Sequence, residues 1–80
     1  MNDELCVVLC TAPDHESATR IGETLLQERL AACVQYEAIR SQYWWHGELC
    51  TDDEVRLTIK TRRALCSAVE VAIIRLHPYD

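Results

Sequence analysis

Two consecutive segments with β-strand patterns, separated by two residues, constrain the fold of this chain more than any other feature. Cys33–Trp45 is rich in valine, tyrosine, isoleucine and tryptophan, and Glu48–Thr61 alternates between apolar and polar side chains. His46-Gly47 between them suits a tight turn. The pattern predicts a hairpin longer than a domain of 80 residues needs, with one face of its second strand buried. The residues Glu37–Ser41 predict an interruption of its first strand.

Three further elements flank this hairpin. Leu5–Thr11 is short and continuously apolar, which predicts a strand covered on both faces. Apolar residues recur at three- and four-residue steps over Asp14–Ala32 and again over Arg62–Leu76, which predicts two amphipathic helices. Gly22 lowers the helix propensity of the first helix, and a partner that packs closely there would explain it. Pro78 is expected to end the second helix.

The order strand, helix, strand, strand, helix indicates the fold class. These are the first five elements of the ferredoxin-like β-α-β-β-α-β unit, an α+β fold, and the last strand is missing from this chain. A length of 80 residues is enough for one domain. We therefore expect a single ferredoxin-like domain over residues 1–80, with a long hairpin and a gap where the last strand would pair.

The charge of the chain limits its partners. Its 8 basic and 13 acidic residues give a net charge of −5, and no cluster of lysine and arginine stands out. Nucleic-acid binding needs such clusters to neutralise phosphates, so no nucleic-acid partner is expected. The apolar runs are too short to span a bilayer, so no membrane partner is expected either. The acidic segment Met1–Glu4 has the wrong sign for a secretory signal, which favours a cytoplasmic location.

The five cysteines form no recognisable metal or redox motif. Their number is odd and none occurs as C-x-x-C, so we expect free, mostly buried thiols in a reducing cytosol. Cys6 and Cys10 lie on one face of the first strand about 13 Å apart, so they cannot share a metal within one chain. Packing explains Cys33 and Cys66, whereas Cys50, near the hairpin turn, is expected to be the most exposed.

Four local motifs resemble those of one known family. They are Val-Leu-Cys-Thr-Ala-Pro-Asp (8–14), Leu-Ala-Ala-Cys (30–33), Ser-x-Tyr-x-Trp-x-Gly (41–47) and His-Pro-Tyr (77–79). In this order and spacing the chain resembles the CutA family of divalent-cation tolerance proteins. The resemblance implies a ferredoxin-like fold and a tight homotrimer in which the long hairpins pair with neighbouring chains. Tyr43, Trp44 and Trp45 are then expected at the subunit interface, because aromatic residues favour interface cores.

The resemblance also implies a metal site. Members of the family continue with a further strand and helix, so the chain is expected to be a C-terminally truncated CutA. Their suggested metal ligands are a cysteine of the first strand, a histidine just before the His-Pro pair and a glutamate of that further segment. Cys10 matches the cysteine, whereas Leu76 occupies the histidine position and the glutamate is absent. Cys10 with the adjacent His77 is therefore the candidate metal pair.

The expected function is that of a divalent-cation tolerance or metal-ion response protein. It would be a homotrimer that binds copper or another divalent cation, since thiolate and imidazole donors suit copper and zinc. The sequence itself requires no cofactor. The alternative is a trimeric scaffold or signalling module, similar to the PII proteins, that binds a small ligand in clefts between subunits. Glycine-rich phosphate loops and a G-x-S-x-G motif are absent, so we do not expect an enzyme.

Overall fold

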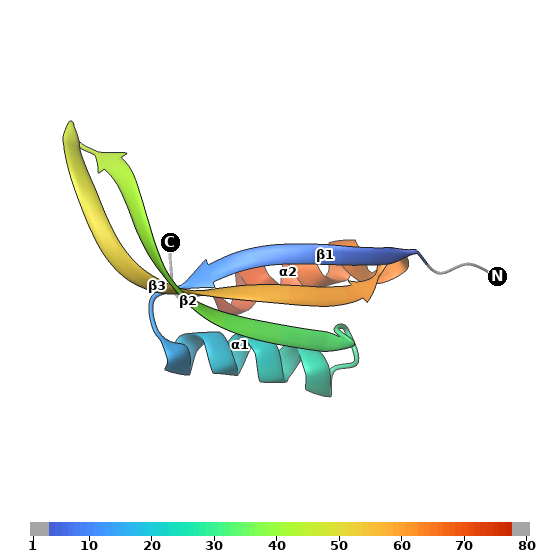
Figure 1. Cartoon of the computed structure of the whole chain (residues 1–80). Coiled ribbons are helices and arrows are strands. Elements are labelled where there is room, and N and C mark those ends of the chain that lie inside the picture. Colours follow the sequence, from blue (N-terminus) through green and yellow to red (C-terminus); the bar gives the residue numbers. More distant parts are fainter. Residues whose placement is uncertain (1–3, 78–80) are drawn as a thin grey trace.

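The computed structural model describes residues 4–77 as one antiparallel sheet of three strands with two helices on one face (Figure 1). The elements in chain order are β1 (Leu5–Ala12), α1 (His15–Gln27), β2 (Cys33–Trp45), β3 (Glu48–Arg62), a 3₁₀ helix η1 (Arg63–Leu65) and α2 (Cys66–Leu76). The strand order is β1-β3-β2. The predicted α+β fold class and element order are confirmed.

The central strand β3 organises the core. It pairs with β1 on one side and β2 on the other, and its alternate residues Val55, Leu57 and Ile59 point toward the helices and are buried. The helices complete the core with Ala18, Ile21 and Leu25 of α1 and Val69, Ala72 and Ile73 of α2. This period-two burial is the one that the alternation of the sequence predicted.

Helix α1 is shorter than expected. Asp14 caps its start by accepting a hydrogen bond from the Ser17 amide at 2.7 Å. Its end lies at Gln27, because Arg29 adopts a left-handed conformation with φ of 62°. The chain turns back there, and the Leu30 amide donates to the Leu25 carbonyl at 2.9 Å. The prediction that the helix runs to Ala32 was therefore wrong.

The long hairpin is continuous. The pairing of β2 with β3 runs unbroken from Cys33 opposite Lys60 to Trp45 opposite Glu48, so the predicted interruption at Glu37–Ser41 is absent. Exposed strands tolerate polar residues, since both faces there meet solvent. The turn places His46 and Gly47 at positive φ, 50° and 78°, as a type I′ turn requires.

The distal part of the hairpin, residues 40–53, extends beyond the helices. We call it the hairpin arm, and Figure 1 shows it curving away from α1. None of its residues is buried, and the molecule is accordingly elongated, with extents of 49 × 22 × 21 Å. Residues 4–77 provide no hydrophobic core for the arm.

The start of the second helix also differs from the prediction. Arg62 is the last residue of β3, the turn η1 follows, and α2 begins only at Cys66. Its end at Leu76 agrees with the sequence pattern. Pro78, predicted to stop this helix, lies outside the described residues. Cys66 is thus the first residue of α2 rather than an interior position of a longer helix.

Gly22 accommodates a residue of the same chain. A Cβ atom built there would lie 2.0 Å from the hydroxyl oxygen of Tyr36 and 2.9 Å from its Cζ atom. The close packing that the glycine predicted is therefore present, and the partner is a side chain of β2.

We expect the Gly22→Ala variant to be less stable than the parent by about 1–2 kcal/mol. Overpacking costs about 1–3 kcal/mol, and the better helix propensity of alanine offsets up to about 1 kcal/mol of this. Urea unfolding followed by circular dichroism measures the difference. The matched background is Tyr36→Ala, in which the same glycine substitution should lose most of its cost. An equal cost in both backgrounds would contradict the contact.

Candidate functional site

Cys10 lies on the helix-facing side of β1. It pairs with Leu57 of β3 and packs half-buried against the core. Burial raises the pKa of its thiol, because a thiolate there would lose hydration. Cys10 is therefore a protonated thiol at neutral pH, and a metal ion would have to displace this proton.

His77 directly follows α2 and reaches back to the end of β1. Its ring Nε2 donates a hydrogen bond to the carbonyl oxygen of Thr11, the residue after Cys10. The fold thus brings the two predicted metal residues to the same end of one strand. This contact fixes the ring nitrogen that carries the proton on His77.

The two residues do not make a metal centre by themselves. Within residues 4–77 no group of three or more histidine, cysteine, aspartate and glutamate side chains is placed to hold a metal ion. Structural and catalytic zinc sites use three or four protein ligands, and copper sites use a similar number. A single chain, as far as it is described, supplies an incomplete donor set at this position.

The hairpin arm carries the predicted aromatic interface residues. Trp44 is 74% exposed and Trp45 is 62% exposed, and Tyr43 is also exposed. Across the hairpin, the Tyr43 hydroxyl donates a hydrogen bond to the Asp52 carboxylate. Tryptophan side chains this exposed are unusual for a chain without partners, since each offers a large apolar surface.

The Tyr43–Asp52 contact should be visible in a titration. The hydrogen bond to Asp52 raises the pKa of Tyr43 to about 12, because ionisation would place two negative charges together. We expect Asp52→Asn to lower this pKa toward the ordinary tyrosine value of about 10. NMR of ¹³Cζ-labelled tyrosine resolves the residue. Asp53→Asn is the matched control and should leave Tyr43 unchanged, whereas equal effects of both variants would argue against the contact.

The sheet face opposite the helices is also apolar in part. Leu5, Val7 and Leu9 of β1 are 84%, 57% and 62% exposed, and they lie beside Thr58, Lys60 and Arg62 of β3. We call these six residues the open sheet face. The expectation that the first strand is covered on both faces is wrong for the isolated chain, because the helices cover one face only.

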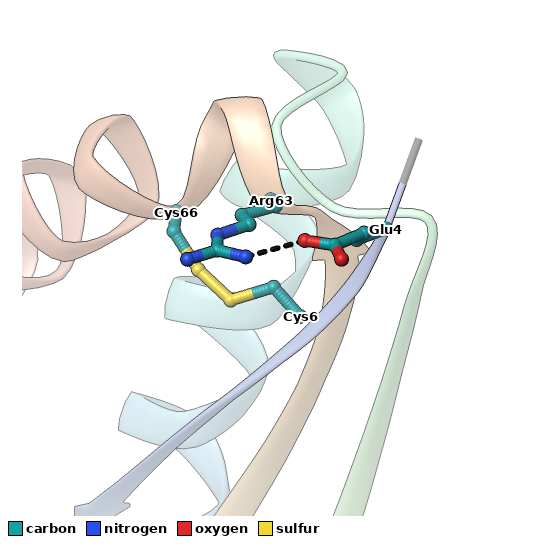
Figure 2. Close-up of polar contacts among 4 residues, drawn as sticks. All are labelled: Glu4, Cys6, Arg63 and Cys66. Atoms are coloured by element: carbon teal, nitrogen blue, oxygen red, sulfur yellow. Dashed lines mark hydrogen bonds and ion pairs between the residues drawn. A yellow bond between two sulfur atoms is a disulfide. The ribbon is translucent and has the colours of Figure 1, made fainter. Parts of the chain in front are cut away.

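Cys6 and Cys66 form a disulfide bond, with their Cα atoms 6.6 Å apart (Figure 2). The prediction that all five thiols are free was therefore wrong, as was packing as the explanation for Cys66. The free cysteines are Cys10, Cys33 and Cys50, and the exposed one is Cys33 rather than Cys50. Cys33 is exposed because it follows the turn after α1 and pairs with Lys60, whose side chain faces solvent.

A shallow pocket lies where the hairpin arm leaves the sheet. It has a volume of about 500 Å³. Its lining residues come from the start of α1 and from both hairpin strands: Pro13, Asp14, His15, Ala38, Ile39, Arg40, Asp53, Glu54 and Val55. Acidic side chains outnumber basic ones there, which favours a ligand with a positive group.

Comparison with known proteins identifies the family. Residues 6–80 match the family model described as CutA1 divalent ion tolerance protein. The chain belongs to the CutA1 family. The divalent-cation tolerance protein CutA of Pyrococcus horikoshii is 43% identical over 76 residues, which are 95% of this chain and 74% of that protein. The predicted resemblance to CutA is confirmed.

Solved structures of the family have the same fold. CutA1 of Ehrlichia chaffeensis superimposes with a TM-score of 0.95 at 32% identity, over 98% of this chain and 74% of that one. The periplasmic divalent cation tolerance protein CutA of Archaeoglobus fulgidus gives 0.90 at 34% identity, over 95% and 74% of the two chains. Neither helix in the described part of the present chain is long and apolar enough to cross a membrane.

Sequence reasoning missed the disulfide, although one signal for it exists. In the split β-α-β order the start of β1 lies beside the end of β3, because the two strands are antiparallel. Cys6 lies near the start of β1, and Cys66 lies four residues after the end of β3. Applying the register to the cysteines would have placed the pair together.

Proposed function

We propose that this chain is a divalent-cation response protein that works as a homotrimer and not as an enzyme. One observation carries the proposal: over residues 4–77, this member of the CutA1 family exposes large apolar side chains on two surfaces, the open sheet face and the hairpin arm. Covering these surfaces by other copies removes apolar area from water and so contributes stability. Tyr43, Trp44 and Trp45 lie in this interface.

The cation, copper or another divalent ion, contacts the end of β1 in this proposal. Cys10 and His77 are two of its donors, supported by the contact of His77 with the residue next to Cys10. The remaining donors come from a neighbouring subunit. Because burial raises the pKa of Cys10, metal uptake strengthens as the pH rises and the thiol proton becomes easier to displace.

Native mass spectrometry of the protein with and without copper(II) or zinc(II) tests both parts. We expect a trimer that takes up metal, with uptake reduced in Cys10→Ala and retained in Cys33→Ala, which removes a free thiol elsewhere. A monomer in all conditions would overturn the trimer. Metal uptake that is equal in the two variants would overturn the role of Cys10.

A second candidate function is a trimeric module, similar to the PII proteins, that binds a small ligand between subunits. The pocket at the root of the hairpin arm favours it, because two strands and a helix meet there. In this case ligand binding survives the Cys10→Ala substitution and is lost when Asp53 and Glu54 are replaced by asparagine and glutamine. Isothermal titration with cationic metabolites distinguishes the two functions.

We also propose that the protein acts in the cytoplasm without a nucleic-acid or membrane partner. Its net charge of −5 supports the absence of a nucleic-acid partner, because a negatively charged protein repels phosphates. Fractionation of cells that express the tagged full chain tests the location, and recovery outside the cytoplasmic fraction would contradict it.

A further inference from the structure

We propose that the Cys6–Cys66 disulfide is a thiol–disulfide exchange site for glutathione, a small acidic thiol. The bridge joins the outer end of β1 to the first residue of α2 and lies apart from Cys10 and His77, which are at the other end of β1. The proposal therefore does not depend on metal binding.

The bridge is accessible. Cys6 and Cys66 are half-buried, and both line a surface pocket of about 560 Å³ with Glu4, Leu5, Arg63 and Ser67. A buried structural disulfide would be shielded from a thiol in solution, whereas this pocket admits a molecule of peptide size. Access is the first requirement for exchange, and the position of the bridge at the edge of the fold meets it.

The pocket holds one cationic and one acidic side chain, and the cationic one offers a contact for an anionic thiol. Arg63 lies in the pocket and pairs with the Glu4 carboxylate, as Figure 2 shows. This arginine is 73% exposed, so its guanidinium group is also open to the carboxylates of glutathione. Exchange rates depend on this kind of local charge, because the attacking group is a thiolate.

The two sulfur atoms are not equivalent. Cys66 is the first residue of α2; its own backbone N–H donates to the Arg63 carbonyl, and no side chain caps the amides that follow it. The amide groups of a first helical turn stabilise a negative charge, and thiolates at helix N-termini are favoured for this reason. Cys66 is therefore the better leaving group, and glutathione attacks the sulfur of Cys6.

Reduction of the Cys6–Cys66 disulfide by glutathione takes two steps. A glutathione thiolate attacks the Cys6 sulfur, forms a mixed disulfide there and releases Cys66 as a thiolate, which then takes a proton from water. A second glutathione thiolate attacks the glutathione sulfur of the mixed disulfide and releases Cys6. Two glutathione molecules are oxidised to one glutathione disulfide, and the protein gains two thiols; oxidation is the reverse.

Reduction would loosen one corner of the fold. The Arg63 amide donates to the Glu4 carbonyl at 2.8 Å, and the Glu4–Arg63 ion pair lies beside the bridge. These exposed polar contacts remain after reduction, but they contribute little in water. The redox state thus controls how firmly the outer end of β1, including Leu5 of the open sheet face, is held.

The test is to equilibrate the full chain at graded ratios of reduced to oxidised glutathione, quench with acid, alkylate under denaturing conditions and count thiols by intact mass. We expect five alkylated cysteines at the reducing end and three at the oxidising end, with a transition between them. Three alkylated cysteines at every ratio would mean that glutathione does not reduce the disulfide. Five alkylated cysteines at every ratio would mean that the disulfide does not form. Either result overturns the proposal. The double variant Cys6→Ser/Cys66→Ser should give three throughout.

Peptide mapping of the wild-type protein early in reduction tests which sulfur is attacked. We expect the mixed disulfide on Cys6 to exceed that on Cys66 by roughly two- to fivefold, the ratio expected from a helix N-terminus. In the Cys66→Ser variant, oxidised glutathione should exchange with the free Cys6 thiolate, releasing one reduced glutathione, and the Cys6 adduct should accumulate, since no second protein thiol is present to displace it. A predominant adduct on Cys66 would overturn the assignment.

Discussion

Replacement of Leu57 by alanine should lower the free energy of unfolding by about 2–5 kcal/mol. Leu57 is fully buried at the centre of β3, where it pairs with Cys10 on one side and Tyr36 on the other. It belongs to the core cluster formed with residues of both helices, so its truncation leaves a cavity there. A domain of this size has little stability to spare, and a loss of this order shifts the urea midpoint strongly.

The matched control is Ile74→Ala. Ile74 is on the outer side of α2 and is 78% exposed, so its removal should change stability by no more than about 0.5 kcal/mol. Urea unfolding at fixed protein concentration, followed by far-ultraviolet circular dichroism, compares the two variants. Similar losses of unfolding free energy for both variants would show that Leu57 does not lie in the hydrophobic core.

Removal of the disulfide should have a comparable effect. The bridge joins residues that are 60 positions apart, and closing a loop of this length restricts the unfolded chain by about 4 kcal/mol. We expect oxidised wild-type protein to exceed Cys66→Ser in stability by roughly this amount. In the presence of a strong reductant the difference should nearly vanish, since neither protein then carries the bridge.

Cys33→Ser provides the control for this second prediction. Its thiol is free and exposed, so the substitution should leave the urea midpoint almost unchanged with or without reductant. A difference between wild type and Cys66→Ser that persists under reduction would show that packing at residue 66, and not the covalent bond, holds α2 to β1.

The sequence predicted the elements well and some of their ends poorly. Alternation over Val55, Leu57 and Ile59 identified the buried face of β3, because a half-buried strand must alternate. The end of α1 was missed because Leu30 continues the helical spacing. Arg29 nevertheless takes a left-handed conformation, which a non-glycine residue signals only weakly.

The candidate site was predictable only in outline. Cys10 and His77 came from local motifs, and the structure brings them to one end of β1. The Cys6–Cys66 bridge and the open sheet face depend on which strands are neighbours and in which register, and no local pattern carries that information. A continuous apolar run such as Leu5–Thr11 indicates burial on both faces, but it does not tell whether the same chain or another provides the cover.

The pairing of β1 also has a consequence for the order of folding. The hairpin β2–β3 closes through a tight local turn. Strand β1, the first in the chain, pairs only with β3, which is distant from it in the sequence. Contacts between distant segments form slowly, since the entropy cost of closing a long loop comes before the contacts contribute favourable free energy. We therefore expect β1 to dock late in folding. Cys6 meets Cys66 only at this step, so the appearance of the disulfide in a refolding experiment would time the completion of the sheet.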